Sequence, residues 1–429
     1  MTLEFRDHQI LVISPGSSLM QAQMGLTESL MPPAFEVPTL VHEGADGRFS
    51  TGARAGARAV RPIVGGKIAR MDALLYLLKA VYRSVTPRDG LPPAVYLVAS
   101  LEWSRRELEQ ITQYLFEQVG VPALGVCLQG VAAAYAFGVA DALVVDVGLD
   151  KTEITAVLAL EASRDASRVV KAGGSTINAN LAPRLPNLSA DQIEDLKTSG
   201  IYEVVGADHR ELGGDSALVD EDGVVDVAAI VASGRAREIL SKREQKGAES
   251  EANADREQNQ FVDRHGQEVT VGLERFVGTE RLVAAIVDAV ADVLYRLEPR
   301  EQQRVFDSIV ITGKGAAVPG LSQLIADKLD VRYVIRPPPS SAAAVAARNG
   351  AVVGTPADDA APAQSPTSLS LAPFPGHFPE WKTRKWDDYV FLGAQIGAKQ
   401  VLTTGVEGLF VGRQDYNEMG PASVWDTFN

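Results

Sequence analysis

The chain has 429 residues, 46% of them hydrophobic, and its 55 Asp and Glu outnumber its 41 Lys and Arg, giving a formal net charge of −14. Such a chain can bury a large core and is too long for one compact domain, and its charge argues against sequence-independent nucleic-acid binding over the whole chain. The single cysteine, Cys127, excludes an internal disulfide framework.

The surroundings of Cys127 and the flanking signals set further expectations. Cys127 lies in the apolar run 124–128, which predicts a buried thiol, with a reactive nucleophile as the alternative. The start of the chain lacks a secretory signal, and no apolar run reaches the roughly 20 residues that span a bilayer. The five histidines show no metal-ligand spacing. We therefore expect an intracellular soluble protein without a metal site.

The first elements alternate between strands and helices. Residues 10–24 predict a hairpin, and a Gly, Ala and Arg rich stretch within 43–60 predicts an exposed loop between short strands. Apolar residues at helical spacing follow from Met71, and 95–99 predicts a buried strand. Ser104 with Glu107 forms a capping box that begins a second helix. This alternation predicts α/β layers.

A second hairpin follows a short helix. Residues 131–138 predict the helix, and 143–158 predict an apolar strand, an acidic turn and an alternating strand that repeat the layout of 10–24. Two such units, each able to hold phosphate or metal at its turn, predict a two-lobed nucleotide cleft built by duplication. The first turn, however, has Ser14 and Pro15 in place of a carboxylate and a free amide.

Two insertions and an apolar tail complete the chain. The charged stretch near 240–260 predicts a solvated helix that frays, and the Ala, Pro and Ser rich stretch 337–373 predicts a flexible excursion. Residues 389–394 then return to a packed core, and 414–425 are too apolar to be a free end. The run 381–386, basic and aromatic, predicts a surface strand with Trp381 buried, or else a contact with DNA or an acidic partner.

Five ordered segments resemble actin and the actin-related proteins over nearly the full length. They correspond to the connecting helix, the second phosphate hairpin, a strand and turn, the adenosine loop and the C-terminal motif of that family: residues 129–138, 143–148, 265–276, 309–320 and 416–421. The resemblance implies an α/β actin fold, with duplicated ribonuclease-H-like lobes around a cleft. It places residues 1–138 with 374–429 in the first lobe and 139–336 in the second.

Further segments resemble the actin-related protein nine subfamily of fungal SWI/SNF and RSC chromatin remodellers. The segments that carry this likeness are residues 113–117, 173–178, 233–235, 378–382, 391–396 and 420–426. The Phe-Pro-Glu-Trp run at 378–381 and the terminal Trp425-Asp426 pair are not general actin features. They favour this subfamily within the family.

The resemblance also identifies a degenerate nucleotide cleft. Its residues are Ser14, Gly16, Ser17, Gln129, Asp146, Gly148, Gly313 and Lys314. Gln129 and Asp146 are retained from the family's set. Gln21 replaces the lysine that binds phosphate, Leu149 replaces an acidic residue, and Glu153 replaces the histidine that orients the attacking water. Charge-assisted contacts are each worth roughly 1.5–3 kcal/mol, so these losses weaken nucleotide binding by orders of magnitude.

Alternatives concern two residues of this cleft, Asp150 and Lys314. Asp150 is an alternative replacement for the acid lost at Leu149, and Lys314, at a family glycine, either fills the adenosine pocket or contacts phosphate. We expect no catalytic residues, no metal and no cofactor, with weak ATP binding as the alternative. Gln129 and Asp146 then act as hinge and packing residues.

A noncatalytic chain must act through its surfaces. The resemblance implies a partner-helix groove formed by Tyr135, Ala136, Phe137, Gly138, Ile396, Val401 and Leu402, unless these residues only pack the lobes together. The exposed arginines 54, 58 and 61 lie where actin engages the next filament subunit, and the scarcity of apolar anchors there disfavours filaments.

The implied function is that of a nuclear subunit of an ATP-dependent chromatin remodelling complex. Its partners would be a second actin-related protein, the helix preceding the remodeller's ATPase domain and other subunits, with nucleosomal DNA contacted only indirectly and no membrane. The alternatives are an active actin-like ATPase and an ATP-binding actin-like protein of a cytoplasmic motor or nucleator complex.

Overall fold

The chain divides into two compact units. The computed structural model describes residues 4–26, 30–87, 90–204, 253–336, 365–376, 378–381, 389–404 and 408–427. Unit 1 comprises Met1–Thr176, Arg281–Ala317 and Ile325–Asn429, and unit 2 comprises Ile177–Glu280 and Val318–Leu324. Both predicted hairpins lie in unit 1, so these units are not the two predicted lobes, whose boundaries stay a prediction.

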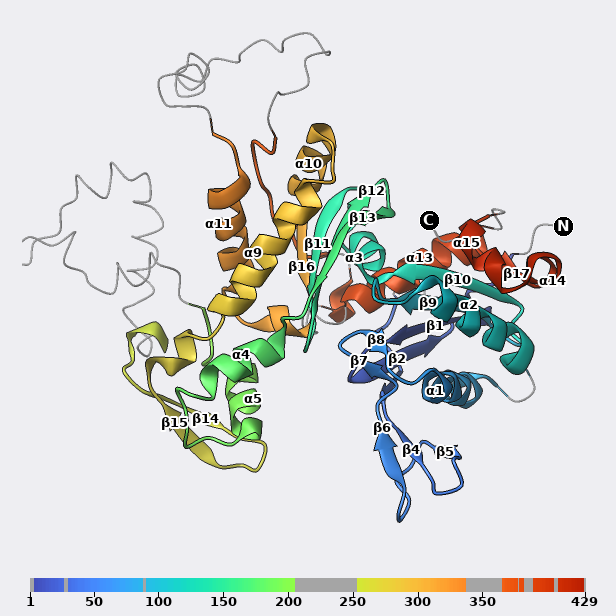
Figure 1. Cartoon of the computed structure of the whole chain (residues 1–429), viewed down its shortest axis with the longest axis horizontal. Helices are drawn as coiled ribbons and strands as arrows, with labels where there is room; N and C mark the ends of the chain where they lie inside the picture. Colours follow the sequence, from blue (N-terminus) through green and yellow to red (C-terminus); the bar gives the residue numbers. More distant parts are fainter. Residues whose placement is uncertain are drawn as a thin grey trace, which may run out of the picture. The chain divides into compact units, whose positions relative to one another are not determined.

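The first large sheet of unit 1 has six strands in the order β17-β10-β9-β1-β2-β3 (Figure 1). Its strands are β1 (Ile10–Pro15), β2 (Leu19–Met24), β3 (Phe35–Pro38), β9 (Ala94–Ala99), β10 (Ala123–Leu128) and β17 (Val411–Gly412). β1 pairs antiparallel with β2, which confirms the first predicted hairpin, and parallel with β9. β17 pairs antiparallel with β10, so the C-terminal segment extends the N-terminal sheet.

The second large sheet of unit 1 has the order β13-β12-β11-β16. Its strands are β11 (Ala142–Val147), β12 (Thr152–Leu158), β13 (Glu161–Val170) and β16 (Ile309–Thr312). The antiparallel pair β11 and β12 confirms the second hairpin. Two hairpins, each with its first strand paired to a parallel neighbour, give the repeated layout that the sequence predicts.

The end of the predicted flexible excursion is ordered against the second sheet. The Ile309 amide donates to the Ser370 carbonyl at 2.8 Å, and the Ala372 amide donates to the Ile309 carbonyl at 2.9 Å. The expectation for 337–373 therefore does not hold at 370–372, because these residues satisfy the backbone groups of β16. Residues 337–364 lie outside the described residues.

Helices cover both sheets (Figure 1). They are α1 (Met71–Val85), α2 (Arg105–Tyr114), α3 (Gln129–Phe137), α9 (Glu280–Leu294), α10 (Pro299–Phe306), α11 (Leu321–Tyr333), α13 (Tyr389–Thr403), α14 (Arg413–Met419) and α15 (Val424–Thr427). The capping box that begins α2 is present, because the Ser104 amide donates to Glu107 Oε2 at 2.7 Å and the Glu107 amide donates to Ser104 Oγ at 3.4 Å. A π-helical turn, η2 (Leu115–Val119), continues α2.

Short strands extend from the first sheet. β4 (Val41–Glu43), β5 (Phe49–Ser50) and β6 (Arg58–Val60) form one small sheet, and β7 (Ile63–Val64) pairs with β8 (Lys67–Ile68). Residues 51–56 between β5 and β6 are exposed, which confirms the predicted loop. Arg54, Arg58 and Arg61 are exposed, and Arg58 pairs with Glu43 at 2.7 Å.

Unit 2 is built around a short hairpin. Its elements are α5 (Ala190–Thr198), β14 (Asn259–Val262) and β15 (Glu268–Val271), with α4 (Gly174–Leu181) entering it from unit 1. The buried Arg275 guanidinium donates to the Asn253 and Gly272 carbonyls at 2.7 and 2.5 Å. The predicted charged insertion lies mostly outside the described residues, but residues 259–260 belong to β14 and not to a fraying helix.

The C-terminal tail packs on unit 1, as its apolar sequence predicts. The Tyr416 ring stacks on Phe116 with a centroid separation of 4.4 Å, and Val424 is buried. Trp381 is also buried, with its Nε1 donating to the Leu30 carbonyl. This confirms the predicted burial of Trp381, but Trp381 ends a 3₁₀ turn (Pro379–Trp381) and not a strand. Residues 382–388 lie outside the described residues.

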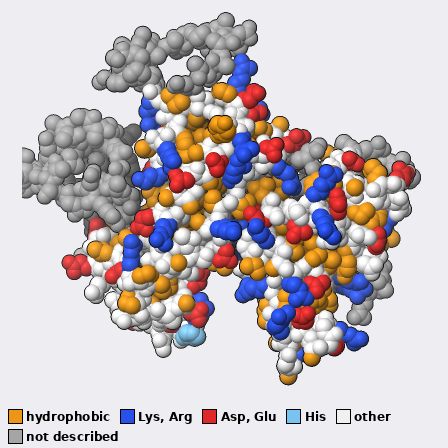
Figure 2. Space-filling model, in the orientation of Figure 1, with side chains coloured by type: hydrophobic (Ala, Val, Ile, Leu, Met, Phe, Trp, Pro, Cys, Tyr) orange, Lys and Arg blue, Asp and Glu red, His pale blue; other side chains and the backbone are white. Residues whose placement is uncertain are grey.

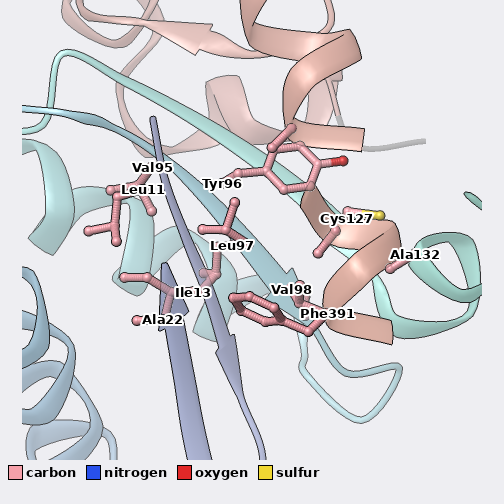
Figure 3. Close-up of a cluster of buried hydrophobic side chains, with 14 of the residues drawn as sticks. Leu11, Ile13, Ala22, Val95, Tyr96, Leu97, Val98, Cys127, Ala132 and Phe391 are labelled. Atoms are coloured by element: carbon pink, nitrogen blue, oxygen red, sulfur yellow. The ribbon is translucent and has the colours of Figure 1, made fainter. Parts of the chain in front are cut away.

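Helices α3 and α13 cross closely beside the first sheet. A Cβ atom on Gly393 would clash with the Ala132 carbonyl oxygen and would lie 2.9 Å from the Ala136 amide nitrogen. Figure 3 shows Phe391 of α13 beside Leu97 and Val98 of β9. The absence of a side chain at Gly393 therefore allows α13 to approach α3 at backbone contact distance.

Cys127 is part of this core. Its side chain lies beside Tyr96 (Figure 3), and burial raises the pKa of the thiol to about 12, although the hydrogen bond from Tyr96 lowers it. The thiol is therefore protonated at physiological pH, because its pKa lies far above that pH. It is not a reactive cysteine, since the thiolate is the nucleophile. The predicted buried thiol is confirmed.

Candidate functional site

The first predicted phosphate turn, between β1 and β2, is closed by its own backbone. The Gly16 amide donates to the Leu19 carbonyl at 2.8 Å. The Ser17 hydroxyl accepts a hydrogen bond from the Gly66 amide at 3.0 Å, so it is engaged by the turn between β7 and β8. Ser14, at the family's carboxylate position, is buried at the end of β1 and carries no charge.

Gln21, at the position of the family's phosphate lysine, bonds to a neighbouring strand. Gln21 lies opposite Ser14 in the ladder of β1 and β2. Its Nε2 donates to Glu36 Oε1 of β3 at 3.2 Å. The amide therefore brings no positive charge to the turn and contacts an acid instead.

The second predicted phosphate turn, between β11 and β12, is held by backbone hydrogen bonds. The Gly148 amide donates to the Lys151 carbonyl at 2.9 Å. The amides of Gly174 and Ser175, at the start of α4, donate to the Gly148 and Leu149 carbonyls at 3.0 and 2.8 Å. Leu149, at an acidic position of the family, has an exposed apolar side chain that cannot ligate a cation.

An ion pair lies directly behind this turn. Lys151 pairs with Glu153 of β12, and their side chains are 12% and 1% exposed. The Lys151 ammonium also donates to Ser100 Oγ at 2.8 Å, and Ser100 Oγ donates to Glu153 Oε1 at 2.6 Å. The Leu101 amide donates to the same carboxylate oxygen at 3.2 Å. Oε1 of Glu153, which the resemblance places at the family's water-orienting histidine, is thus bonded to an internal cation and two donors, whereas its buried Oε2 has no hydrogen-bond partner among the described residues.

The turn between β7 and β8 contacts this network. Gly66 has a φ of +79°, and a Cβ atom there would clash with the Lys151 ammonium group. The Gly66 carbonyl accepts from Trp103 Nε1 at 3.1 Å, and Trp103 is buried. Gly66 therefore lies between the first phosphate turn, Trp103 and Lys151.

The remaining predicted cleft residues lie on the neighbouring elements. Gln129 begins α3, and its Oε1 is buried without a hydrogen-bond partner among the described residues. Asp146 lies between Glu153 of β12 and Thr312 of β16 in the second sheet. Gly313 follows β16, and Lys314 is exposed. Lys314 therefore does not occupy a buried pocket.

These side chains do not supply the donor set for magnesium and a triphosphate. Ser14 and Leu149 offer no carboxylate, Gln21 offers no charge, and the Lys151 ammonium is already paired. Hydrolysis on this fold by metal assistance requires acidic ligands and a positioned water. In the described parts of the chain, no group of three His, Cys, Asp or Glu side chains is arranged to hold a metal ion.

The sequence reading missed Lys151, Ser100 and Trp103. Lys151 directly precedes β12 and Glu153 is the second residue of that strand. Side chains two positions apart along a strand leave the same face, which places these two side chains together. This spacing is a usable signal for the ion pair. Ser100 lies about fifty positions earlier, and only the folded chain brings its hydroxyl to Glu153.

The predicted partner-helix groove residues divide between the core and the surface. Ala136 and Leu402 are buried, and Leu402 has no exposed surface. Tyr135, Phe137, Ile396 and Val401 are half-buried, and Gly138 is exposed. Phe137 packs against Phe374 and Tyr389 at centroid separations of 5.5 and 5.8 Å. The half-buried side chains retain surface for a partner, whereas Leu402 can only support them.

The structure contains no transmembrane candidate in the parts it describes: none of those helices has the length and apolar character to cross a bilayer.

Comparison with known proteins places this site in a family. Residues 7–352 match the family described as Actin. The chain is 23% identical to the SWI/SNF and RSC complexes subunit arp9 of Schizosaccharomyces pombe (strain 972 / ATCC 24843) over 523 residues, covering 98% of this chain and 99% of the relative. It is also 26% identical to actin-related protein 7 of Arabidopsis thaliana over 200 residues, covering 44% of this chain and 54% of the relative. The family match covers most of the chain, and both duplicated hairpins are present, so the chain belongs to the actin family and has an actin fold.

Proposed function

We propose that this chain is a noncatalytic actin-related subunit of an ATP-dependent chromatin remodelling complex. It pairs with a second actin-related protein and clamps the helix that precedes the remodeller's ATPase domain, which couples ATP hydrolysis to nucleosome movement. It acts in the nucleus and needs no nucleotide or metal. The end-to-end similarity to a protein named as a SWI/SNF and RSC subunit supports the assembly.

The observation that carries the noncatalytic assignment is the buried Lys151–Glu153 pair. A catalytic cleft of this family would need Glu153's position for water and the surrounding space for phosphate. Here an internal ammonium group and the Ser100 hydroxyl both contact Oε1 of the Glu153 carboxylate. A triphosphate would have to displace these contacts without the charge of a phosphate lysine or a bound cation to repay their loss.

The groove beside α3 and α13 supports the proposed helix partner. Tyr135, Phe137, Ile396 and Val401 keep part of their apolar surface exposed, as helix-in-groove docking requires. Buried neighbours hold these residues in place, because α3 and α13 approach at backbone distance. A rigid apolar surface reduces the entropy lost when a partner helix docks.

The surface charge supports an indirect role toward nucleosomal DNA. The chain carries a formal net charge of −14. Figure 2 shows acidic and basic side chains intermixed over the visible face. Phosphate contacts dominate nucleic-acid affinity, so a surface of this kind favours protein partners over DNA.

The first test is a calorimetric titration of the purified chain with ATP and magnesium. We expect no binding heat at protein concentrations where an ATP-binding actin, used as the positive control, titrates fully. A thermal melt with and without the nucleotide gives an independent readout, because a ligand that binds the native state raises its melting temperature. Tight, magnesium-dependent binding would contradict the noncatalytic assignment and favour an active actin-like ATPase.

The second test identifies the assembly. Chains copurified with the tagged protein should include a remodeller ATPase and a second actin-related protein, and a complex that lacks this chain should retain basal ATPase activity but couple it less well to nucleosome movement. Copurification with motor or nucleator subunits would favour the cytoplasmic alternative. Unchanged remodelling after clean removal would refute the coupling role.

A further inference from the structure

The two large sheets of unit 1 are joined by polar contacts at two places outside their apolar core. The first is the network described above, in which β12 of the second sheet contacts the end of β9 in the first. Lys151 and Glu153 belong to β12 or its turn, whereas Ser100 and Leu101 follow β9. With Glu153 only 1% exposed, these bonds lie in a water-poor environment where electrostatic contacts are strong.

The second place is Trp425 of α15. Its ring lies against two arginines, with Arg105 of α2 at 4.9 Å and Arg164 of β13 at 5.9 Å from the ring centroid. Its Nε1 donates to Glu109 of α2 at 2.9 Å, and Glu109 pairs with Arg105 at 3.3 Å. Trp425 therefore connects a helix that covers the first sheet to a strand of the second.

The two places are linked electrostatically through Arg164. Burial lowers the pKa of Arg164, and the negative charge of Glu153 opposes that shift. Glu153 thus belongs to the first contact, and its negative charge also interacts with Arg164, which belongs to the second. The members of the combined cluster are Ser100, Leu101, Arg105, Glu109, Lys151, Glu153, Arg164 and Trp425, which we call the clasp.

We infer that the clasp joins the two sheets of unit 1 by side-chain contacts of this chain alone, so that their arrangement is fixed without a bound nucleotide. The inference rests on the proposed function, in which nucleotide binding and hydrolysis are lost. It adds which side chains hold the two sheets together in place of a nucleotide. Lys151 supplies the positive charge beside Glu153 that a cation or a phosphate-binding residue would otherwise bring. Trp425 supplies a second link that does not depend on the cleft.

The position of Trp425 is set by contacts of the tail upstream of it. Trp425 is the residue of the 420–426 segment that reaches both α2 and β13. Tyr416 and Arg413 fix the tail upstream, because the Tyr416 hydroxyl donates to Glu117 at 2.8 Å and Arg413 donates to the Phe116 carbonyl at 2.9 Å. The tail is therefore held at one end of the first sheet and presents Trp425 to the second.

The test measures the distance between the sheets by pulsed electron spin resonance on the full chain. Spin labels are attached to Gln110→Cys on α2 and Arg300→Cys on α10, which are exposed and lie in elements that flank different sheets. The native Cys127 is buried with a raised thiol pKa, so it does not compete for the label. We expect one narrow distance distribution that magnesium and ATP leave unchanged.

Two variants remove the two contacts separately. Lys151→Met removes the ammonium, and Trp425→Leu removes the ring and its N–H but keeps an apolar side chain. Each should broaden the distribution, and the two together should broaden it most. Arg168→Ala is the matched control, because this arginine lies on the same strand as Arg164 but bonds to the Asp165 and Ser167 carbonyls and pairs with Asp292.

The outcomes separate this inference from the proposed function. A broad distribution in the unmodified chain, or narrow distributions in both folded variants, would overturn the clasp while leaving the noncatalytic role intact. A distance distribution that becomes narrower when magnesium and ATP are added would overturn both the clasp and the noncatalytic role. The third outcome is tight ATP binding by calorimetry together with the expected broadening of the distance distribution in the clasp variants. It would overturn the noncatalytic role alone.

Discussion

Replacing Lys151 with methionine should destabilise unit 1 by about 3–5 kcal/mol, the range found when one partner of a buried ion pair is removed. The variant keeps a side chain of similar length but leaves the Glu153 carboxylate, 1% exposed, without its adjacent ammonium group. The bonds from Ser100 and Leu101 remain and compensate the charge only in part. Urea unfolding followed by circular dichroism measures the loss as a lower transition midpoint at an unchanged slope.

Two comparisons test the cause of that loss. Lys67→Met removes an exposed lysine that pairs with the half-buried Glu102 at 3.0 Å, and should cost about 1 kcal/mol or less, because the lysine stays in contact with solvent. Lys151→Met combined with Glu153→Gln should be more stable than Lys151→Met alone, because no unpaired charge is then buried. An effect of Lys151→Met as small as that of Lys67→Met would show that the pair is effectively solvated.

Replacing Gly393 with alanine should destabilise the chain by at least about 3 kcal/mol, the upper part of the range for overpacking a close contact. Helix propensity alone predicts the opposite sign, because alanine in a helix interior is favoured over glycine by about 1 kcal/mol. The clash prevails because the new methyl group meets the backbone carbonyl of Ala132, which cannot move without shifting α3. Urea unfolding gives the magnitude.

Gly397→Ala on the same helix is the matched control. A Cβ atom there would lie 2.7 Å from the Tyr96 hydroxyl, which is the far end of a side chain and can shift more readily than a backbone carbonyl. We expect a clearly smaller loss of stability than for Gly393→Ala. A neutral or stabilising Gly393→Ala would mean that α3 and α13 separate easily and would weaken the case for a rigid groove.

The sequence predicted the hairpins, the helix from Met71, the capping box at Ser104 and the packed tail. These elements are encoded locally: apolar residues alternate in the strands, recur at helical spacing in the helices, and the serine caps its own helix within three residues. The motifs along the chain likewise predicted the actin fold, which the family match confirms. Local patterns were sufficient because each element forms its pattern from residues that are near in sequence.

Local patterns were less informative where long-range bonding decides the structure. Residues 370–372 have a composition typical of a flexible segment, but the backbone groups of Ile309 order them as a bonded extension beside β16. Among the groove residues, composition does not distinguish Leu402, which is fully buried, from Val401, which is half-buried. The rotation of α13 against its neighbours decides which side chains remain available.

Side-chain identities along the chain were enough to predict the duplicated hairpins of an actin-type cleft in which Asp146 is kept but the phosphate lysine and two acids are replaced, because the identity of a side chain fixes its charge. The groups that contact Glu153 could be identified only from the folded chain. Ser100 bonds to Glu153 from about fifty positions earlier in the chain, and Gly66, which accepts a hydrogen bond from Trp103, lies against Lys151. Trp425 contacts Arg164 from a distant part of the sequence. Such contacts depend on how strands and helices pack against one another, which no local pattern specifies.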